Sequence, residues 1–267
     1  MIKIILQNLY MVYAFLLLVI LILLAVPFTI LLMLLPLKIK NTGMFWLLKA
    51  ISNAWFFLTG MYPQKFHKNK IDKKHSYVII PNHSSFIDAG IIYSALFHPF
   101  KTLGKVEVEK VPIYNIIYRT VVISVDRSSL KNKAISFRKM LQTLDEGISI
   151  LIFPEGSFPD TPQDSLLPFQ NGAFSLAITK QCELLPILFL DAPARLHPSK
   201  INQIYPGPNR IVYLPTISTL NLTKEAVSSL KEYTATYMQA CLSFCKNNNI
   251  ENVWDYAQNW KKSHCIV

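Results

Sequence analysis

The most apolar part of the chain is its N-terminal region. No charged residue occurs between Lys3 and Lys38, and most of that stretch is hydrophobic. A helix rises about 1.5 Å per residue, so roughly 20 residues cross a hydrocarbon core of about 30 Å. The pattern therefore predicts a membrane helix over about residues 10–37, with Pro27 and Pro36 positioned to kink it or end it. Both a transmembrane helix and a monotopic anchor fit this pattern.

A second apolar stretch covers residues 44–61 and is rich in aromatic side chains, but it also contains Lys49 and several polar residues. This composition is typical of an interfacial amphipathic helix, and a core helix of the following domain is the alternative. We therefore predict a membrane anchor over residues 1–62 and a separate domain over residues 63–267. More lysines follow the first apolar run than precede it. The positive-inside rule then places the domain on the cytoplasmic face of a membrane, which in a bacterium is the inner membrane.

The pattern beyond the anchor alternates between short β-branched runs and amphipathic stretches. Strands are predicted at residues 77–80, 121–125, 148–153, 184–190 and 210–214. Helices are predicted between them and after them, at residues 89–96, 130–145, 172–180 and 224–246. Short apolar strands that alternate with helices indicate an α/β fold, here a mixed sheet flanked by helices.

The composition adds a strong positive charge to this picture. The formal net charge is +11 at pH 7, which suits nucleic acid, anionic lipid headgroups or phosphorylated small molecules. Next to a hydrophobic anchor, membrane lipid is the nearer explanation, and the sequence contains no nucleic-acid-binding motif. The four cysteines form no C-x-x-C pair and the six histidines are scattered, so we expect no metal site.

Residues 82–88 follow the apolar run 77–80, in the kind of strand-end loop where α/β folds build their sites. A neutral imidazole at His83 can take a proton from a hydroxyl near neutral pH. Asp88 can accept the other ring N–H, fix the tautomer and stabilise the imidazolium. A substrate hydroxyl can then be the nucleophile without an enzyme serine. The Ser85-x-x-Asp88 spacing also fits a helix capping box, so a purely structural role is the alternative.

Several segments, in this order and spacing, resemble the glycerophospholipid acyltransferase family, and within it the 1-acyl-glycerol-3-phosphate acyltransferases. The chain reads NHSSFID at residues 82–88, VVISVDR at 121–127, FPEGS at 153–157, FQNGAF at 169–174 and LPI at 185–187. The corresponding family blocks are N-H-x-x-x-x-D, G-x-I-F-I-D-R, F-P-E-G-T, F-K-x-G-A-F and V-P-I. The resemblance covers roughly residues 60–220.

The resemblance implies that His83 is the general base and that Asp88 orients it. It also implies that the acyl acceptor is held by Lys105, Arg127, Glu155, Gly156 and Ser157. A guanidinium offers a planar fork to phosphate oxygens, so Arg127 is a sound phosphate ligand, with an ion pair to Asp126 as the alternative.

Glu155 carries the same charge sign as a phosphate, so we expect it to accept from the glycerol hydroxyl or from a basic side chain. Gly156 permits close backbone approach, and its N–H can stabilise a tetrahedral oxyanion. Two positions depart from the family pattern, because Phe158 stands where Arg is usual and Gln170 where Lys is common. Both changes remove positive charge from the expected headgroup region, which leaves open an acceptor without a phosphate monoester.

The activity implied by the resemblance is transfer of a fatty acyl chain from a thioester to the sn-2 hydroxyl of lysophosphatidic acid, giving phosphatidic acid. Acyl-CoA or acyl-carrier protein would be the co-substrate, and no cofactor is expected. A different lyso-lipid acceptor, such as a lyso-aminolipid, and a non-catalytic membrane scaffold are the alternatives. A serine hydrolase is disfavoured because the chain has no G-x-S-x-G motif. The sequence leaves the oligomeric state open.

Overall fold

A single seven-stranded sheet forms the centre of the molecule. The computed structural model describes residues 2–106, 114–125 and 129–264. The strand order is β1-β7-β6-β2-β5-β3-β4, and the neighbouring strands are parallel except for the antiparallel pair β6 and β7. The strands are β1 (Met61–Phe66), β2 (Val78–Pro81), β3 (Phe100–Lys105), β4 (Val122–Val125), β5 (Ser149–Leu151), β6 (Leu184–Phe189) and β7 (Gly207–Tyr213). The mixed sheet flanked by helices confirms the predicted fold class.

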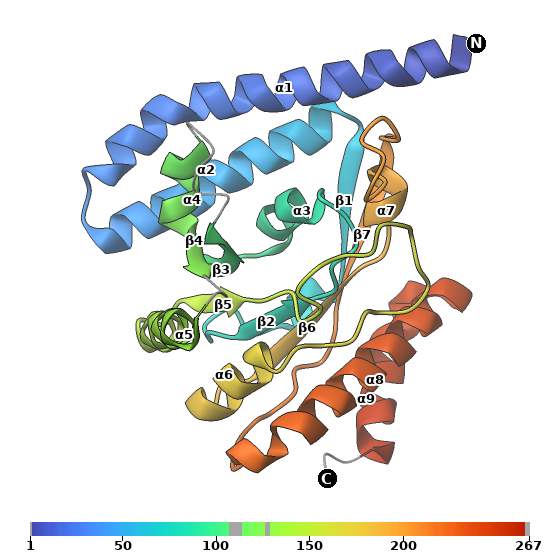
Figure 1. Cartoon of the computed structure of the whole chain (residues 1–267). Coiled ribbons are helices and arrows are strands. Elements are labelled where there is room, and N and C mark those ends of the chain that lie inside the picture. The colour runs from blue at the N-terminus through green and yellow to red at the C-terminus, as the bar shows by residue number, and fades with distance from the viewer. Residues whose placement is uncertain (1, 107–113, 126–128, 265–267) are drawn as a thin grey trace.

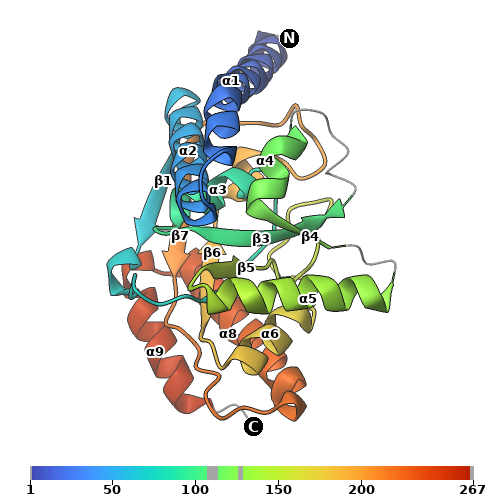
Figure 2. The same ribbon diagram turned by 90° about the vertical axis from the view of Figure 1, so that its left-hand side faces the viewer.

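Helices cover both faces of this sheet (Figure 1). Successive strand residues point to opposite sides, so Val78 and Ile80 enter one hydrophobic cluster and Ile79 the other. One side, called here the anchor face, carries α1 (Ile2–Met33), α2 (Leu37–Leu58), α3 (Asp88–Ala95), α4 (Tyr114–Val121) and α7 (Ala192–Arg195). The other side, called the opposite face, carries α5 (Leu130–Asp145), α6 (Gly172–Lys180), α8 (Val227–Asn247) and α9 (Val253–Ser263). Figure 2 shows the same two layers from the side.

The N-terminal region forms a helical hairpin with boundaries that differ from the predicted ones. The first helix ends at Met33 rather than near residue 37, because Pro36 occupies the N-cap of α2. Pro27 lies inside α1 and does not end it. The second helix spans residues 37–58 instead of 44–61, and Gly60, with a φ of +68°, follows its C-terminal end.

The N-terminal half of α1 is held against the end of α2 by directional hydrogen bonds. The hydroxyl of Tyr10 donates to the carbonyl of Thr59 at 2.6 Å, and the indole N–H of Trp55 donates to the carbonyl of Ala14 at 2.8 Å. By length and composition α1 could cross a membrane, yet only 11% of its most apolar part is buried. Its exposed apolar side chains include Leu9, Val12, Leu16, Val19, Leu23, Leu24, Phe28 and Leu31. This helix therefore docks on the domain with one side and presents a long apolar surface with the other.

Candidate active site

The loop after β2 begins from a fixed point in the sheet. The side-chain amide of Asn82 donates to the carbonyl of Phe189 in β6 at 3.1 Å, and its oxygen accepts the N–H of the same residue at 2.7 Å. Asn82 is buried, so this pair of bonds is shielded from water. The next residue, His83, therefore leaves the carboxyl end of the sheet from a locked backbone position.

His83 and Asp88 form the pair that the sequence predicts. Nδ1 of His83 lies 2.8 Å from Oδ2 of Asp88, whose side chain is fully buried. The same oxygen accepts the backbone N–H groups of Ser84 at 2.7 Å and Ser85 at 2.9 Å. Asp88 is the first residue of α3, where a negative charge also interacts favourably with the helix dipole. The N-cap of α3 is Ile87 rather than Ser85, so these bonds hold the loop before the helix and do not form the capping box that was the alternative. One carboxylate therefore fixes both that loop and the imidazole.

Glu155 links the histidine loop to a second loop. Its Oε1 accepts the backbone N–H of His83 at 2.7 Å, and its Oε2 accepts the N–H of Leu167 at 2.9 Å. The side chain is only 6% exposed, and this burial raises the pKa of the carboxyl, while the two N–H donors act to lower it. Both oxygens are thus engaged by the protein backbone, an arrangement that the sequence did not predict.

Gly156 and Ser157 complete the turn that follows Glu155. Gly156 has a φ of +75°, a conformation that favours glycine, and its N–H donates to the carbonyl of Phe153 at 3.1 Å. That N–H therefore closes the turn, so it is not free to stabilise an oxyanion as the glycine suggested. Ser157 is exposed beside it.

Of the expected acceptor ligands, Lys105 is placed by its backbone alone and Arg127 lies outside the described residues. Lys105 is the last residue of β3, and β3, β5 and β2 run parallel, so their carboxyl ends meet at one edge of the sheet. The side chain of Lys105 and the whole of Arg127 lie outside the described residues. Their proposed contacts with the acceptor remain predictions.

The sequence analysis did not predict the aromatic surroundings of the base. The ring of Phe153 stacks on the imidazole of His83 with centroids 4.0 Å apart, and that of Phe158 packs against it at 4.6 Å. The one available signal was that Phe153 is the first residue of the F-P-E-G block, since ring contacts between two loops depend on the fold. Among the described residues, no group of three or more His, Cys, Asp or Glu side chains could hold a metal ion.

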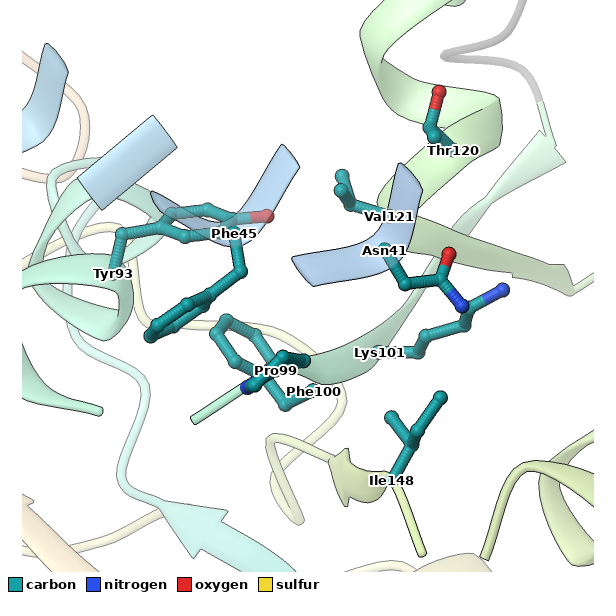
Figure 3. Close-up of a pocket in the computed structure, with 9 residues that line it drawn as sticks. All are labelled: Asn41, Phe45, Tyr93, Pro99, Phe100, Lys101, Thr120, Val121 and Ile148. Carbon is teal, nitrogen blue, oxygen red and sulfur yellow. The ribbon is translucent and has the colours of Figure 1, made fainter. Parts of the chain in front are cut away.

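A separate small pocket lies at the other edge of the sheet (Figure 3). Phe100 and Lys101 begin β3 and Ile148 precedes β5, so this pocket lies at the amino ends of strands whose carboxyl ends face His83. It is lined by Asn41, Phe45, Tyr93, Pro99, Phe100, Lys101, Thr120, Val121 and Ile148. None of these residues is a histidine or a carboxylate, so we assign it no catalytic role.

The geometry of the site supports base catalysis. Nδ1 is engaged with Asp88, which leaves Nε2 as the ring nitrogen that can take a proton. No hydrogen bond joins Nε2 to another residue that the structure describes. The imidazole is 19% exposed, enough for a substrate hydroxyl to reach it.

Several known proteins are similar to this chain. The Acyltransferase family model matches residues 64–190, which include His83, Asp88 and Glu155. An uncharacterized acyltransferase of Schizosaccharomyces pombe is 29% identical over 198 residues, covering 73% of this chain and 67% of that protein. A 1-acyl-sn-glycerol-3-phosphate acyltransferase of Helicobacter pylori is 28% identical over 193 residues, covering 69% of this chain and 78% of that protein.

A solved structure extends the likeness to the whole fold. The crystal structure of the 1-acyl-sn-glycerophosphate acyltransferase from Thermotoga maritima has a TM-score of 0.74 and 17% sequence identity, and the match covers 92% of this chain and 97% of that chain. The family model covers a little less than half of the chain, and the solved structure shows a likeness of fold. In its matched segment and in its relatives, the chain is similar to the glycerophospholipid acyltransferase family.

Proposed function

We propose that this acyltransferase works at a membrane surface and transfers a fatty acyl chain from a thioester to the sn-2 hydroxyl of 1-acyl-glycerol-3-phosphate, giving phosphatidic acid. The observation that carries the proposal is the 2.8 Å contact between Nδ1 of His83 and the buried carboxylate of Asp88. That contact orients the ring and leaves Nε2 for the acceptor.

The reaction needs no covalent enzyme intermediate. As the acceptor oxygen attacks the thioester carbonyl carbon, its proton passes to Nε2 of His83 and a C–O bond forms. The tetrahedral intermediate then collapses, the C–S bond breaks, and the thiolate takes the proton from the imidazolium. Asp88 stabilises that imidazolium while it lasts, because the carboxylate is buried and cannot be screened by water.

The position of the anchor supports a lipid acceptor. α1 exposes a long apolar surface, and α1 and α2 lie on the same face of the sheet as α3, which begins with Asp88 (Figure 1). A bilayer bound by that surface would lie on the side of the domain that carries the catalytic carboxylate. The activity for which the Helicobacter pylori relative is named supports the choice of acceptor. Acyl-CoA and acyl-carrier protein remain equal candidates for the donor.

Product analysis with the purified full-length chain tests the proposal. The protein in vesicles is given acyl-CoA or acyl-carrier-protein thioesters together with a panel of lyso-lipids, and products are identified by mass. We expect phosphatidic acid from lysophosphatidic acid, and none from the His83→Ala variant. Turnover by His83→Ala would show that His83 is not the general base. A folded wild-type protein that acylates nothing in the panel would favour the non-catalytic scaffold.

A second acceptor class is favoured by two residues of the site. Phe158 packs on the catalytic imidazole, and Gln170 is exposed where a lysine would bring a positive charge. An acceptor without a phosphate monoester, such as a lyso-aminolipid, needs less positive charge at these positions. The same panel therefore includes a lyso-aminolipid and lysophosphatidylethanolamine, and faster turnover of either one than of lysophosphatidic acid would replace the first acceptor with the second class.

A further inference from the structure

Two phenylalanine rings from different loops meet beside the catalytic imidazole. Phe158, after the Glu155 turn, packs on His83 with centroids 4.6 Å apart and an interplanar angle of 74°. It also packs on Phe86, from the histidine loop, at 4.7 Å and 78°. Both distances and angles lie in the range in which aromatic rings attract each other edge to face. We call Phe86 and Phe158 the aromatic rim.

The rim lies close to the place where the acceptor must react. A hydroxyl that gives its proton to Nε2 of His83 must come within about 2.6–3.2 Å of that nitrogen. The first carbons of an sn-1 acyl chain lie only a few bonds from that hydroxyl, so they can reach the Phe158 ring, which already contacts the imidazole. Phe86 is 60% exposed, so an aromatic surface remains open next to the base.

We propose that the aromatic rim binds the hydrocarbon of the acceptor beside its reacting hydroxyl, and so selects acceptors that already carry an acyl chain over unacylated glycerol phosphate. The inference rests on the proposed function, because it requires a hydroxyl that reacts at His83. Burial of apolar surface contributes about 25 cal/mol per Å², and a lyso-lipid supplies such surface at this position. Glycerol phosphate has almost none, and its polar groups would lose water against the rings without gaining partners there. Phe158 and Phe86 are therefore specificity-determining residues.

Short soluble acceptors provide the sharpest test, because they do not partition into detergent micelles. The purified full chain receives glycerol 3-phosphate, 1-butyryl-glycerol 3-phosphate or 1-hexanoyl-glycerol 3-phosphate, with the thioester donor that the panel shows to be used. Each value of kcat/KM is measured for the wild type, Phe158→Ser, Phe86→Ser and Phe158→Leu, which keeps an apolar side chain. The matched control is Phe57→Ser, since Phe57 is an 81% exposed phenylalanine on α2, outside the catalytic loop.

We expect the wild type to prefer the hexanoyl acceptor over glycerol 3-phosphate. In Phe158→Ser that preference should fall about tenfold, which corresponds to about 1.4 kcal/mol, and in Phe86→Ser by a smaller factor. Phe158→Leu and Phe57→Ser should keep it. An equal loss for all three acceptors in Phe158→Ser would overturn the inference, because Phe158 would then only support the imidazole. If the wild type acylates lyso-lipids without any chain preference, the proposed role of the aromatic rim fails while the proposed function stands. If it acylates none of the acceptors, the proposed function fails as well.

Discussion

The two faces of the sheet differ in where the hydrogen bonds between their elements lead. On the opposite face, α6, α8 and α9 pack on the strands through a continuous hydrophobic cluster that includes Phe174, Leu230 and Met238, all fully buried. Apolar packing is non-directional, so it stabilises the domain without fixing any single atom closely. The opposite face also has directional bonds, such as those from Tyr237 and Lys261 to the carbonyls of Pro215 and Thr216 in the loop after β7. The anchor face likewise combines a hydrophobic cluster with hydrogen bonds between its elements.

Those hydrogen bonds converge on α3, the helix that begins with Asp88. Nζ of Lys49, from α2, donates to the carbonyls of Tyr93 at 3.0 Å, Ser94 at 3.2 Å and Leu96 at 2.5 Å. The hydroxyl of Ser52 donates to the carbonyl of Gly90 at 2.6 Å. Tyr93, Ser94 and Leu96 lie at the C-terminal end of α3, where carbonyls lack intrahelical partners, whereas Gly90 lies inside the helix. The anchor helix α2 therefore helps to place α3 and the Asp88 carboxylate, and activity and stability should respond differently on the two faces.

The largest effect is expected at Asp88 itself. Asp88→Asn removes the charge that orients and stabilises the imidazolium, so kcat should fall about 1,000-fold. The measurement is product formation under saturating donor and acceptor, with thermal melting to verify the fold. Wild-type turnover in this variant would mean that Asp88 only holds the loop before α3.

The opposite face should show the reverse behaviour. Leu230 on α8 is fully buried in the apolar cluster, so Leu230→Ala should lower the free energy of unfolding by about 3 kcal/mol. The kcat of the folded fraction should stay within about twofold of the wild type, because an apolar cavity there changes no hydrogen bond in the site. Denaturant unfolding in detergent gives the unfolding free energy. Product formation at denaturant concentrations below the unfolding transition gives kcat. A large loss of kcat at full folding would contradict the separation of the faces.

Three of the helices on the opposite face, α5, α6 and α8, could be predicted because they carry local signals, whereas α9 was not predicted. The helices at 130–145 and 172–180 have the predicted bounds, since amphipathic periodicity and helix ends are encoded nearby. The strand β1, with the sequence MYPQKF, was not predicted. It contains a proline and polar residues, and it exists because it pairs with β7, well over 100 positions later in the chain. β3, with Lys101 and Gly104, likewise depends on pairing with β4 and β5.

The contacts of the site also fall into two groups, those that follow from nearby residues and those that depend on the fold. His83 and Asp88 are five positions apart, so their contact follows from one loop and could be predicted from spacing. Glu155 reaches the backbone N–H of His83 across 72 positions, and only the parallel pairing of β2 with β5 brings them together. A backbone donor carries no sequence signature, which is why Glu155 was predicted as a substrate ligand. The described residues favour a positioning role for it, through the loops rather than the acceptor.

The third prediction concerns that positioning role. Glu155→Gln keeps the shape of the side chain but turns one acceptor into an N–H₂ donor that faces a backbone N–H, so the two loops should separate slightly. We expect kcat to fall about 30-fold, or about 2 kcal/mol, with the KM for the acceptor nearly unchanged. Steady-state kinetics with varied acceptor separate the two parameters. A rise in the acceptor KM at constant kcat would instead make Glu155 a substrate ligand, as the family resemblance implied.

The smallest effect is expected at Lys49, where it tests the link between the anchor and α3. Burial lowers the pKa of Lys49 to about 8, below the value of an exposed lysine. The unfolded chain therefore binds more protons at this residue between pH 8 and about 10, and its contribution to stability must rise with pH across that range. The difference in unfolding free energy between the wild type and Lys49→Met should consequently increase from pH 8 to pH 10.

Activity at neutral pH completes the test of Lys49. Lys49→Met leaves three carbonyls of α3 without their donor, and we expect kcat to fall about fivefold, which is about 1 kcal/mol. Lys49→Arg, which keeps several N–H donors, is the matched control and should lose less. If Lys49→Met lowered stability without changing kcat, the polar contacts of the anchor face would serve only to hold the helices together, and the two faces would not differ in role.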